Sequence, residues 1–242
     1  MVVMDFSGIY EREHFLEGIS VSRIDVRGLS GCSCYCDEEA MGVLREKIRE
    51  FSPGGMHFLD SGNYHYMSLL WMEKIAEPFR LAVFDNHTDM QPPAFGGILS
   101  CGGWIAEALE KLPFLREVIL CGPDEEAFAQ VPEAWKRKVR FLSRETRDSW
   151  EETLAELPAD LPVYLSIDKD VLCKEEACTT WSQGELTRKE LLRCLAVLCT
   201  RLAAKGQSVI GVDICGECDP DQAEGSEKND ASNRALLEFF GI

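Results

Sequence analysis

The sequence predicts an α/β protein, in which a mostly parallel sheet is covered by helices on both faces. Short apolar segments alternate along the chain with longer segments of helical periodicity, and this alternation is typical of parallel strands joined by helices. Two of the apolar segments end in aspartates, as strands that lead into a ligand site often do. With 242 residues and 45% hydrophobic content, the chain can bury a large core, and we expect one domain over residues 1–242.

Seven segments have the length and the apolar character of strands, and each is bounded by polar, glycine or proline residues. They cover residues 22–26, 57–60, 80–85, 117–122, 139–143, 162–168 and 208–214. Helical patterns lie between them at residues 36–51, which end at a Ser-Pro-Gly-Gly segment, and at residues 64–77, which end before Pro78.

The clearest helix is predicted over residues 188–204. Thr187 and Glu190 have the spacing of a capping box, and Gly206 follows the expected end. An apolar stripe runs along one side of this helix, formed by Leu191, Leu195, Leu198 and Leu202. The stripe predicts that this helix packs against the sheet.

The apolar segment at residues 81–84 leads directly into Asp85, His87 and Asp89. Alternate side chains of an extended chain point the same way, so these three would share one side. Carboxylates beside a neutral imidazole suit manganese, iron or zinc, whereas calcium and magnesium favour oxygen alone. The residues therefore predict a metal site, although Asp-Asn-His-Thr-Asp would also make an acceptable turn.

A second apolar segment, residues 161–167, ends in carboxylates two residues apart, Asp168 and Asp170. If both segments belong to one parallel sheet, their carboxyl ends lie at the same edge, where open α/β sheets place their ligands. Four clustered carboxylates would repel one another, and two divalent cations would balance their charge. The charge count therefore favours two metals.

Three motifs together resemble those of the arginase and agmatinase family of ureohydrolases. They are Gly-Asn-Tyr-His at residues 62–65, Asp-Asn-His-Thr-Asp at residues 85–89 and Ser-Ile-Asp-Lys-Asp at residues 166–170, in the family's order. The similarity continues more weakly through residues 184–188, residues 217–220 and a closing helix near residues 229–240. It implies an arginase-like three-layer α/β/α sandwich around an eight-stranded sheet.

The resemblance also implies a binuclear centre with two manganese ions per chain, and other divalent metals would fit too. Its ligands would be His65, Asp85, His87, Asp89, Asp168 and Asp170. Asp89 and Asp168 would lie near or between both ions. The implied reaction is hydrolysis of a guanidine, an amidine or a linear amide by a metal-bridging hydroxide, with Asp89 as the catalytic residue that orients the water.

The sequence departs from the family in the segments that would contact the substrate. The loop at residues 91–103 lacks the histidine that family members with guanidine or amidine substrates usually carry, which argues against arginase activity itself. Lys169 stands where an apolar residue is more usual. By the resemblance, Glu217 is the expected catalytic carboxylate for binding a guanidinium, and Asp213 is the second candidate, since the segment at residues 212–220 resembles a version one residue longer than the family's. The predicted substrate contacts are Gln91, Ser100, Cys101 and Glu217.

Composition narrows the classes of partner. A formal net charge of -17 argues against nucleic acid, which requires clustered basic residues. No segment approaches the ~20 apolar residues of a membrane span, and the first residues do not resemble a signal peptide. We therefore expect a cytoplasmic protein that acts on a small molecule. Members of the family that the sequence resembles often form oligomers, so a homo-oligomer is possible.

Eleven cysteines are an odd number, which favours reduced thiols over a disulfide framework. The densest group is Cys32, Cys34 and Cys36, which could bind a soft metal or could be separate thiols near a strand end. Their spacing falls outside the usual zinc-finger pattern. The second interpretation is therefore favoured.

Two other functions remain open from the sequence. A noncatalytic relative could keep the metal pair for folding or regulation and have lost turnover. A mononuclear zinc deacetylase of a related fold would need one metal per chain and would release acetate, but the complete second set of ligands argues against it.

Overall fold

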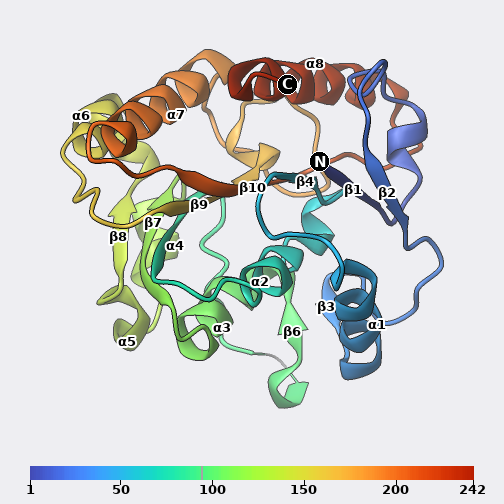
Figure 1. Cartoon of the computed structure of the whole chain (residues 1–242), viewed down its shortest axis with the longest axis horizontal. Helices are drawn as coiled ribbons and strands as arrows, with labels where there is room; N and C mark the ends of the chain where they lie inside the picture. The colour runs from blue at the N-terminus through green and yellow to red at the C-terminus, as the bar shows by residue number, and fades with distance from the viewer. Residues whose placement is uncertain (94) are drawn as a thin grey trace.

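The computed structural model describes residues 1–93 and 95–242, with only the backbone described for residues 95, 223 and 224 (Figure 1). In that part of the chain, eight strands form one sheet in the order β2-β1-β4-β10-β9-β5-β7-β8, with each neighbouring pair parallel. The strands are β1 (Val2–Asp5), β2 (Ser22–Asp25), β4 (Met56–Phe58), β5 (Phe79–Phe84), β7 (Leu115–Cys121), β8 (Val139–Leu142), β9 (Val163–Asp168) and β10 (Val209–Cys215). The predicted parallel α/β class is confirmed.

Helices cover both faces of this sheet, which completes the three-layer sandwich (Figure 1). One face carries α6 (Trp150–Ala155), α7 (Arg188–Ala203) and α8 (Ala223–Phe240). The other carries α1 (Glu38–Ile48), α2 (Met67–Met72) and α3 (Trp104–Lys111). The short helices α4 (Glu125–Ala129) and α5 (Glu133–Lys136) follow β7, and β3 (Tyr35–Cys36) pairs antiparallel with β6 (Leu99–Ser100) beside α1.

Short 3-10 turns join several of these elements. They are η1 (Ile9–Glu11), η2 (Gly62–Tyr64), η3 (Phe95–Gly97), η4 (Cys101–Gly103), η5 (Arg144–Ser149) and η6 (Lys169–Val171). Two of them follow strands at the carboxyl edge of the sheet: η2 comes after β4, and η6 comes directly after β9. At these two strand ends, short turns therefore position the side chains that follow the strands.

The seven predicted strands are all present, whereas β1 was not predicted. Its sequence, Val-Val-Met-Asp, is too short for a periodic pattern, and all four residues are buried. Helix α7 begins as the capping box predicts, because the Thr187 hydroxyl accepts from the Glu190 amide and the Glu190 carboxylate accepts from the Thr187 amide. The four leucines of its stripe are buried.

Several helices differ from the sequence prediction: α8 begins at Ala223 and not near residue 229, and α4, α5 and α6 were not predicted. Helix α2 covers Met67–Met72 only, because the chain first makes the 3-10 turn Gly62–Tyr64. All six of its residues are buried, so it shows no polar face that would mark its ends. Helix α3 was not predicted, since it follows the Cys101–Gly103 turn and is eight residues long.

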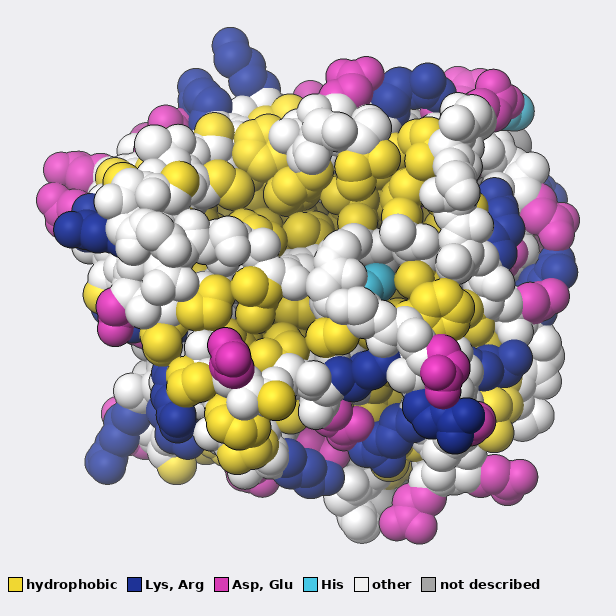
Figure 2. Space-filling model, in the orientation of Figure 1, with side chains coloured by type: hydrophobic (Ala, Val, Ile, Leu, Met, Phe, Trp, Pro, Cys, Tyr) yellow, Lys and Arg dark blue, Asp and Glu magenta, His cyan; other side chains and the backbone are white. Residues whose placement is uncertain are grey.

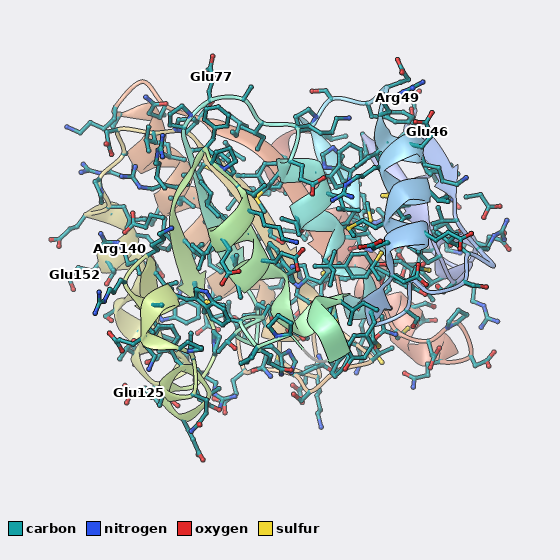
Figure 3. The ribbon with its side chains drawn as sticks, turned by 90° about the horizontal axis from the view of Figure 1, so that it is seen from below. Glu46, Arg49, Glu77, Glu125, Arg140 and Glu152 are labelled. Carbon is teal, nitrogen blue, oxygen red and sulfur yellow. The ribbon has the colours of Figure 1, made fainter. Side chains whose placement is uncertain are left out.

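Apolar side chains pack on both sides of the sheet, and charged side chains lie at the surface. Figure 3 shows Glu46, Arg49, Glu77, Glu125, Arg140 and Glu152 pointing outward. Figure 2 shows hydrophobic side chains gathered in a hollow beneath α7 and α8. Partly buried residues such as Val209 and Phe240 pack against the core cluster that contains the leucines of α7. Among the described residues, no helix is both long and apolar enough to cross a bilayer.

Candidate metal centre

The predicted metal ligands come from neighbouring strands of the sheet. Strand β9 lies between β10 and β5, and Phe84 is paired with Ile167, so Asp85 and Asp168 follow at adjacent strand ends. His65 follows η2, which leaves β4 on the far side of β10. The parallel sheet therefore delivers all three motifs to its carboxyl edge, as the strand pattern predicts.

All six predicted ligands line one cavity of about 220 Å³. Three of the four predicted substrate contacts, Gln91, Ser100 and Cys101, line it as well. The remaining wall consists of Cys34, Tyr35, Gly62, Gly102 and Trp181. Sequence order and spatial convergence therefore agree for nine of the predicted site residues.

The ligand atoms form two groups that share Asp85. In the first group, Nδ1 of His65 lies 3.2 Å from Asp85 Oδ2 and 3.0 Å from Asp89 Oδ2, with Asp168 Oδ2 at 3.5 Å. In the second, Nδ1 of His87 lies 2.8 Å from Asp170 Oδ2 and 3.5 Å from Asp85 Oδ1. Two atoms bound to one cation at ~2.1 Å and about 90° apart would be ~3 Å from each other, which matches these separations.

The grouping of the ligand atoms differs in one detail from the sequence interpretation. Asp89 and Asp168 were expected near or between both ions, but Asp89 belongs only to the group of His65. Asp85 is the residue whose two oxygens face different histidines. This carboxylate, directly after β5, therefore belongs to both groups.

Hydrogen bonds hold both histidines in orientations that suit metal binding. His65 Nε2 lies 2.8 Å from Ser166 Oγ, and His87 Nε2 lies 2.9 Å from Ser182 Oγ. With Nε2 bonded to a hydroxyl, Nδ1 is left facing the carboxylates. Asp89 is held too, since the Trp104 indole donates to its Oδ2 at 2.6 Å.

Close backbone packing supports the same edge. Asp89 has φ +48°, a left-handed conformation that Asp tolerates better than most residues. Gly122, at the end of β7, has φ +134°, and a Cβ there would meet the Asp85 carbonyl oxygen at 1.9 Å. The strand carrying Asp85 can therefore approach its neighbour only because residue 122 is glycine.

The carboxylates carry more negative charge than their surroundings neutralise. Burial, followed by the charge of Asp85, raises the pKa of Asp89 to about 7, although His65 opposes the shift. Burial likewise raises the pKa of Asp170, with Asp168 and Asp85 adding to it. Burial would lower the pKa of His87, but the facing carboxylates of Asp170 and Asp85 raise it to about 12. The cluster therefore favours binding positive charge.

The donor set fits a pair of divalent cations. Asp85 Oδ2 is buried and accepts no hydrogen bond from the described residues, so it has a lone pair available for a metal. Four carboxylates and two imidazoles are the mixture that suits manganese, iron or zinc. His65, Asp85, Asp89 and Asp168 would hold one ion, and Asp85, His87 and Asp170 would hold the other.

Glu217 does not join this cavity, contrary to its predicted catalytic and substrate-binding roles. Its side chain is fully buried and forms an ion pair with Lys169. Asn233 of α8 accepts from Lys169 Nζ at 3.0 Å and donates to Glu217 Oε1 at 2.8 Å. The lysine at position 169 thus holds the carboxylate in a separate internal network.

The sequence interpretation missed part of the cavity wall. Trp181 and Tyr35 are 42% and 43% exposed and stand at the cavity. Tyr35 arrives through the short β3–β6 pairing, which has too few residues for a strand pattern. Trp181 lies in a segment without helix or strand, and its indole donates to Asn63 Oδ1 at 2.9 Å. An exposed tryptophan beside the third motif was the one available indication.

The cysteine cluster resolves into separate thiols. Cys32 and Cys36 are buried in the core, whereas Cys34 lines the cavity. None of the three belongs to a metal-ligand group among the described residues. The favoured interpretation of the sequence, thiols near a strand end, agrees with these positions.

Comparison with known proteins now gives the family. The family model described as "Arginase family" matches residues 10–241. An uncharacterized protein of Thermotoga maritima is 32% identical, over 97% of this chain and 87% of its own length. The chain therefore belongs to the arginase family.

Solved structures show the same fold at low sequence identity. An arginase of Entamoeba histolytica, in complex with L-ornithine, gives a TM-score of 0.71 at 13% identity, covering 100% of this chain and 97% of its own. An arginase of Bacillus caldovelox gives 0.69 at 17% identity, with coverage of 100% and 97%. The formimidoylglutamase of Bacillus subtilis gives 0.69 at 15% identity, with coverage of 99% and 86%. The arginase-like architecture predicted from the motifs is confirmed.

Proposed function

We propose that this protein is a binuclear-metal hydrolase of a non-peptide C–N bond in a guanidino, amidino or linear amide compound. The observation that carries the proposal is the convergence of six predicted ligands on one cavity, where Asp85 belongs to two ligand groups and Asp168 lies beside His65. A mononuclear site would not need the second group, which argues against the deacetylase alternative. When bound, the cations would supply Lewis acidity and lower the pKa of a water molecule.

The chain's own residues supply orientation in this proposal. Asp89 Oδ2 faces His65 and is fixed by Trp104, so Asp89 can accept a hydrogen bond from the attacking water. Gln91 and Ser100 offer amide and hydroxyl groups at the cavity wall. Ring faces of Tyr35 and Trp181 can pack against the rest of the substrate.

The wall of the cavity favours an uncharged substrate end. Apart from the six ligands, the described residues that line it carry no formal charge, and Glu217 is occupied by Lys169. A guanidinium would therefore lose its hydration without gaining a carboxylate partner. A linear amide or a similar neutral group fits better, because it needs only hydrogen-bond donors and acceptors.

A second candidate is a noncatalytic relative that keeps the metal pair for stability. One observation favours it: the described cavity wall contains no histidine besides the two predicted ligands, so a proton shuttle must come from elsewhere. This candidate predicts metal-dependent stability without turnover.

The test begins with protein dialysed free of metal and titrated with Mn²⁺. We expect two ions per chain, and release of ammonia, urea or an amine from some member of a panel of guanidino, amidino and amide compounds. Asp89→Asn should abolish turnover, while Asp148→Asn, at an exposed aspartate away from the cavity, should not. Two bound ions without turnover on any compound would support the noncatalytic candidate, and failure to bind metal would contradict both.

A further inference from the structure

A buried thiol lies directly beside the first ligand group. Cys215 is the last residue of β10 and is paired with Asp168 of β9. Its side chain is 1% exposed, and its Sγ donates to Asp168 Oδ2 at 3.2 Å. One ligand atom from each of His65, Asp168 and Cys215 lies within 4.8 Å of the others. The sulfur is therefore placed among atoms already assigned to one cation.

The distance between Cys215 Sγ and Asp168 Oδ2 is that expected for two ligand atoms of one metal ion. Zinc–sulfur bonds are ~2.3 Å long and zinc–oxygen bonds ~2.1 Å, so the two atoms would lie ~3.1 Å apart at a right angle. The separation of Cys215 Sγ and Asp168 Oδ2 agrees with this value. A second observation points to the same position: the buried Asp85 Oδ2, which lacks a hydrogen bond in the described structure, lies 3.2 Å from His65 Nδ1.

We propose that Cys215 is a sulfur ligand of the ion held by His65, and that this position selects a borderline metal such as zinc or ferrous iron over manganese. The inference rests on the two-metal site of the proposed function. Coordination breaks the S–H bond and releases the proton to solvent, and the sulfur lone pair forms the bond to the metal without any change of oxidation state. Thiolate donors favour these metals, because manganese prefers oxygen.

The second ligand group provides an internal contrast. Asp85, His87 and Asp170 form it, and no thiol belongs to it among the described residues. Its nitrogen and oxygen donors suit manganese. The two positions would therefore differ in metal preference, although they share Asp85.

Cobalt(II) tests the assignment by spectroscopy, because only a coordinated thiolate gives an intense near-ultraviolet sulfur-to-cobalt charge-transfer band. We expect this band in metal-free wild-type protein titrated with Co²⁺, together with weaker visible bands from all bound cobalt. Cys215→Ser should lose the charge-transfer band and keep the visible bands. Cys101→Ser is the matched control, since Cys101 lines the cavity but belongs to no ligand group among the described residues, and it should keep both.

The outcomes separate this inference from the proposed function. Two bound cobalt ions without the charge-transfer band would overturn the role of Cys215 and leave the two-metal site intact. Persistence of the band in Cys215→Ser would overturn it as well. Absence of cobalt binding would contradict both proposals.

Competition between metals gives a second measurement that does not depend on activity. Cys215→Ser should weaken zinc binding at one of the two positions by at least about 10-fold, and should change manganese affinity by less than about twofold. Equal losses for both metals would show that the thiol only supports the fold. Far-ultraviolet circular dichroism of the metal-free variants checks that each remains folded.

Discussion

The end of β9 separates two buried polar clusters that differ in charge balance. Asp168 and Asp170 face the cavity, whereas Lys169, between them, pairs with Glu217 and Asn233 beneath α8. In the cavity cluster, buried carboxylates outnumber the cationic groups. In the Lys169 cluster, one ammonium meets one carboxylate. Of these three successive residues, the two aspartates thus belong to the cavity and the lysine belongs to a buried ion-pair cluster.

A second acidic group, Glu13, joins the Lys169 cluster without changing its charge balance. Glu13 Oε2 accepts from Asn233 Nδ2 at 2.9 Å. Burial, together with the charge of Glu217, raises the pKa of Glu13 to about 10, so it keeps its proton at neutral pH. The cavity cluster has negative charge that the chain does not neutralise, which indicates a ligand site. The Lys169 cluster is neutralised by the chain itself, which indicates a structural role.

The largest expected effect comes from the carboxylate that both ligand groups share. Asp85→Asn should remove most of both metal ions and lower turnover at least about 10³-fold, because losing several kcal/mol of transition-state stabilisation has that consequence. Asp170→Asn should mainly remove the ion held by His87. Metal analysis of the purified variants checks both. Equal losses in the two variants would contradict the shared role of Asp85.

The Lys169 cluster should affect stability more than metal content. Lys169→Met leaves Glu217 buried without its cation, and we expect a loss of about 3–5 kcal/mol in the free energy of unfolding. Adding Glu217→Gln should recover much of that loss, because the double variant buries no lone charge. Urea denaturation of the two single variants and the double variant measures the coupling.

The variant Glu217→Gln alone distinguishes the two roles considered for this residue. A structural partner of Lys169 gives lower stability with nearly unchanged kinetics per folded molecule. A substrate contact, as the motif comparison suggested, would give a loss in kcat/KM at unchanged stability. The second result would contradict the separation of the two clusters.

The sequence predicted the residues of the cavity better than the buried residues around it. Asp85 and His87 follow a buried strand at alternate positions, and parallel pairing alone brings them to Asp168. Glu217 could not be placed in the same way, because its partner Lys169 follows another strand and is distant in the sequence. Cys215 and Ser166 read simply as strand residues until β10, β9 and η2 are brought together. The local sequence pattern is enough to predict where the strands end. Which side chains meet at those ends depends on contacts between segments that are distant in the sequence.

A smaller effect is expected from the hydroxyl that orients His65. Ser166→Ala removes the partner of His65 Nε2 and should weaken metal affinity about 10–100-fold, the usual cost of losing such support. Ser182→Ala, at the more exposed His87, should cost less. Titration with a fluorescent metal indicator measures both. A change confined to thermal stability, with unaltered affinity, would show that Ser166 acts only in packing.

The smallest effect concerns Glu13 and depends on pH. Its pKa is about 10 in the folded protein and near 4.5 in the unfolded chain, so the folded state binds more protons between these values and stability falls as pH rises through that range. Glu13→Gln removes this dependence and keeps an oxygen that can accept from Asn233. We expect the variant to gain stability relative to wild type between pH 4 and pH 8, because the contribution of the Glu13 proton to wild-type stability falls over that range. Urea midpoints at the two pH values measure it. A stability gain that is the same at both would mean that Glu13 does not hold a proton, and that the Lys169 cluster carries the same kind of uncompensated charge as the cavity.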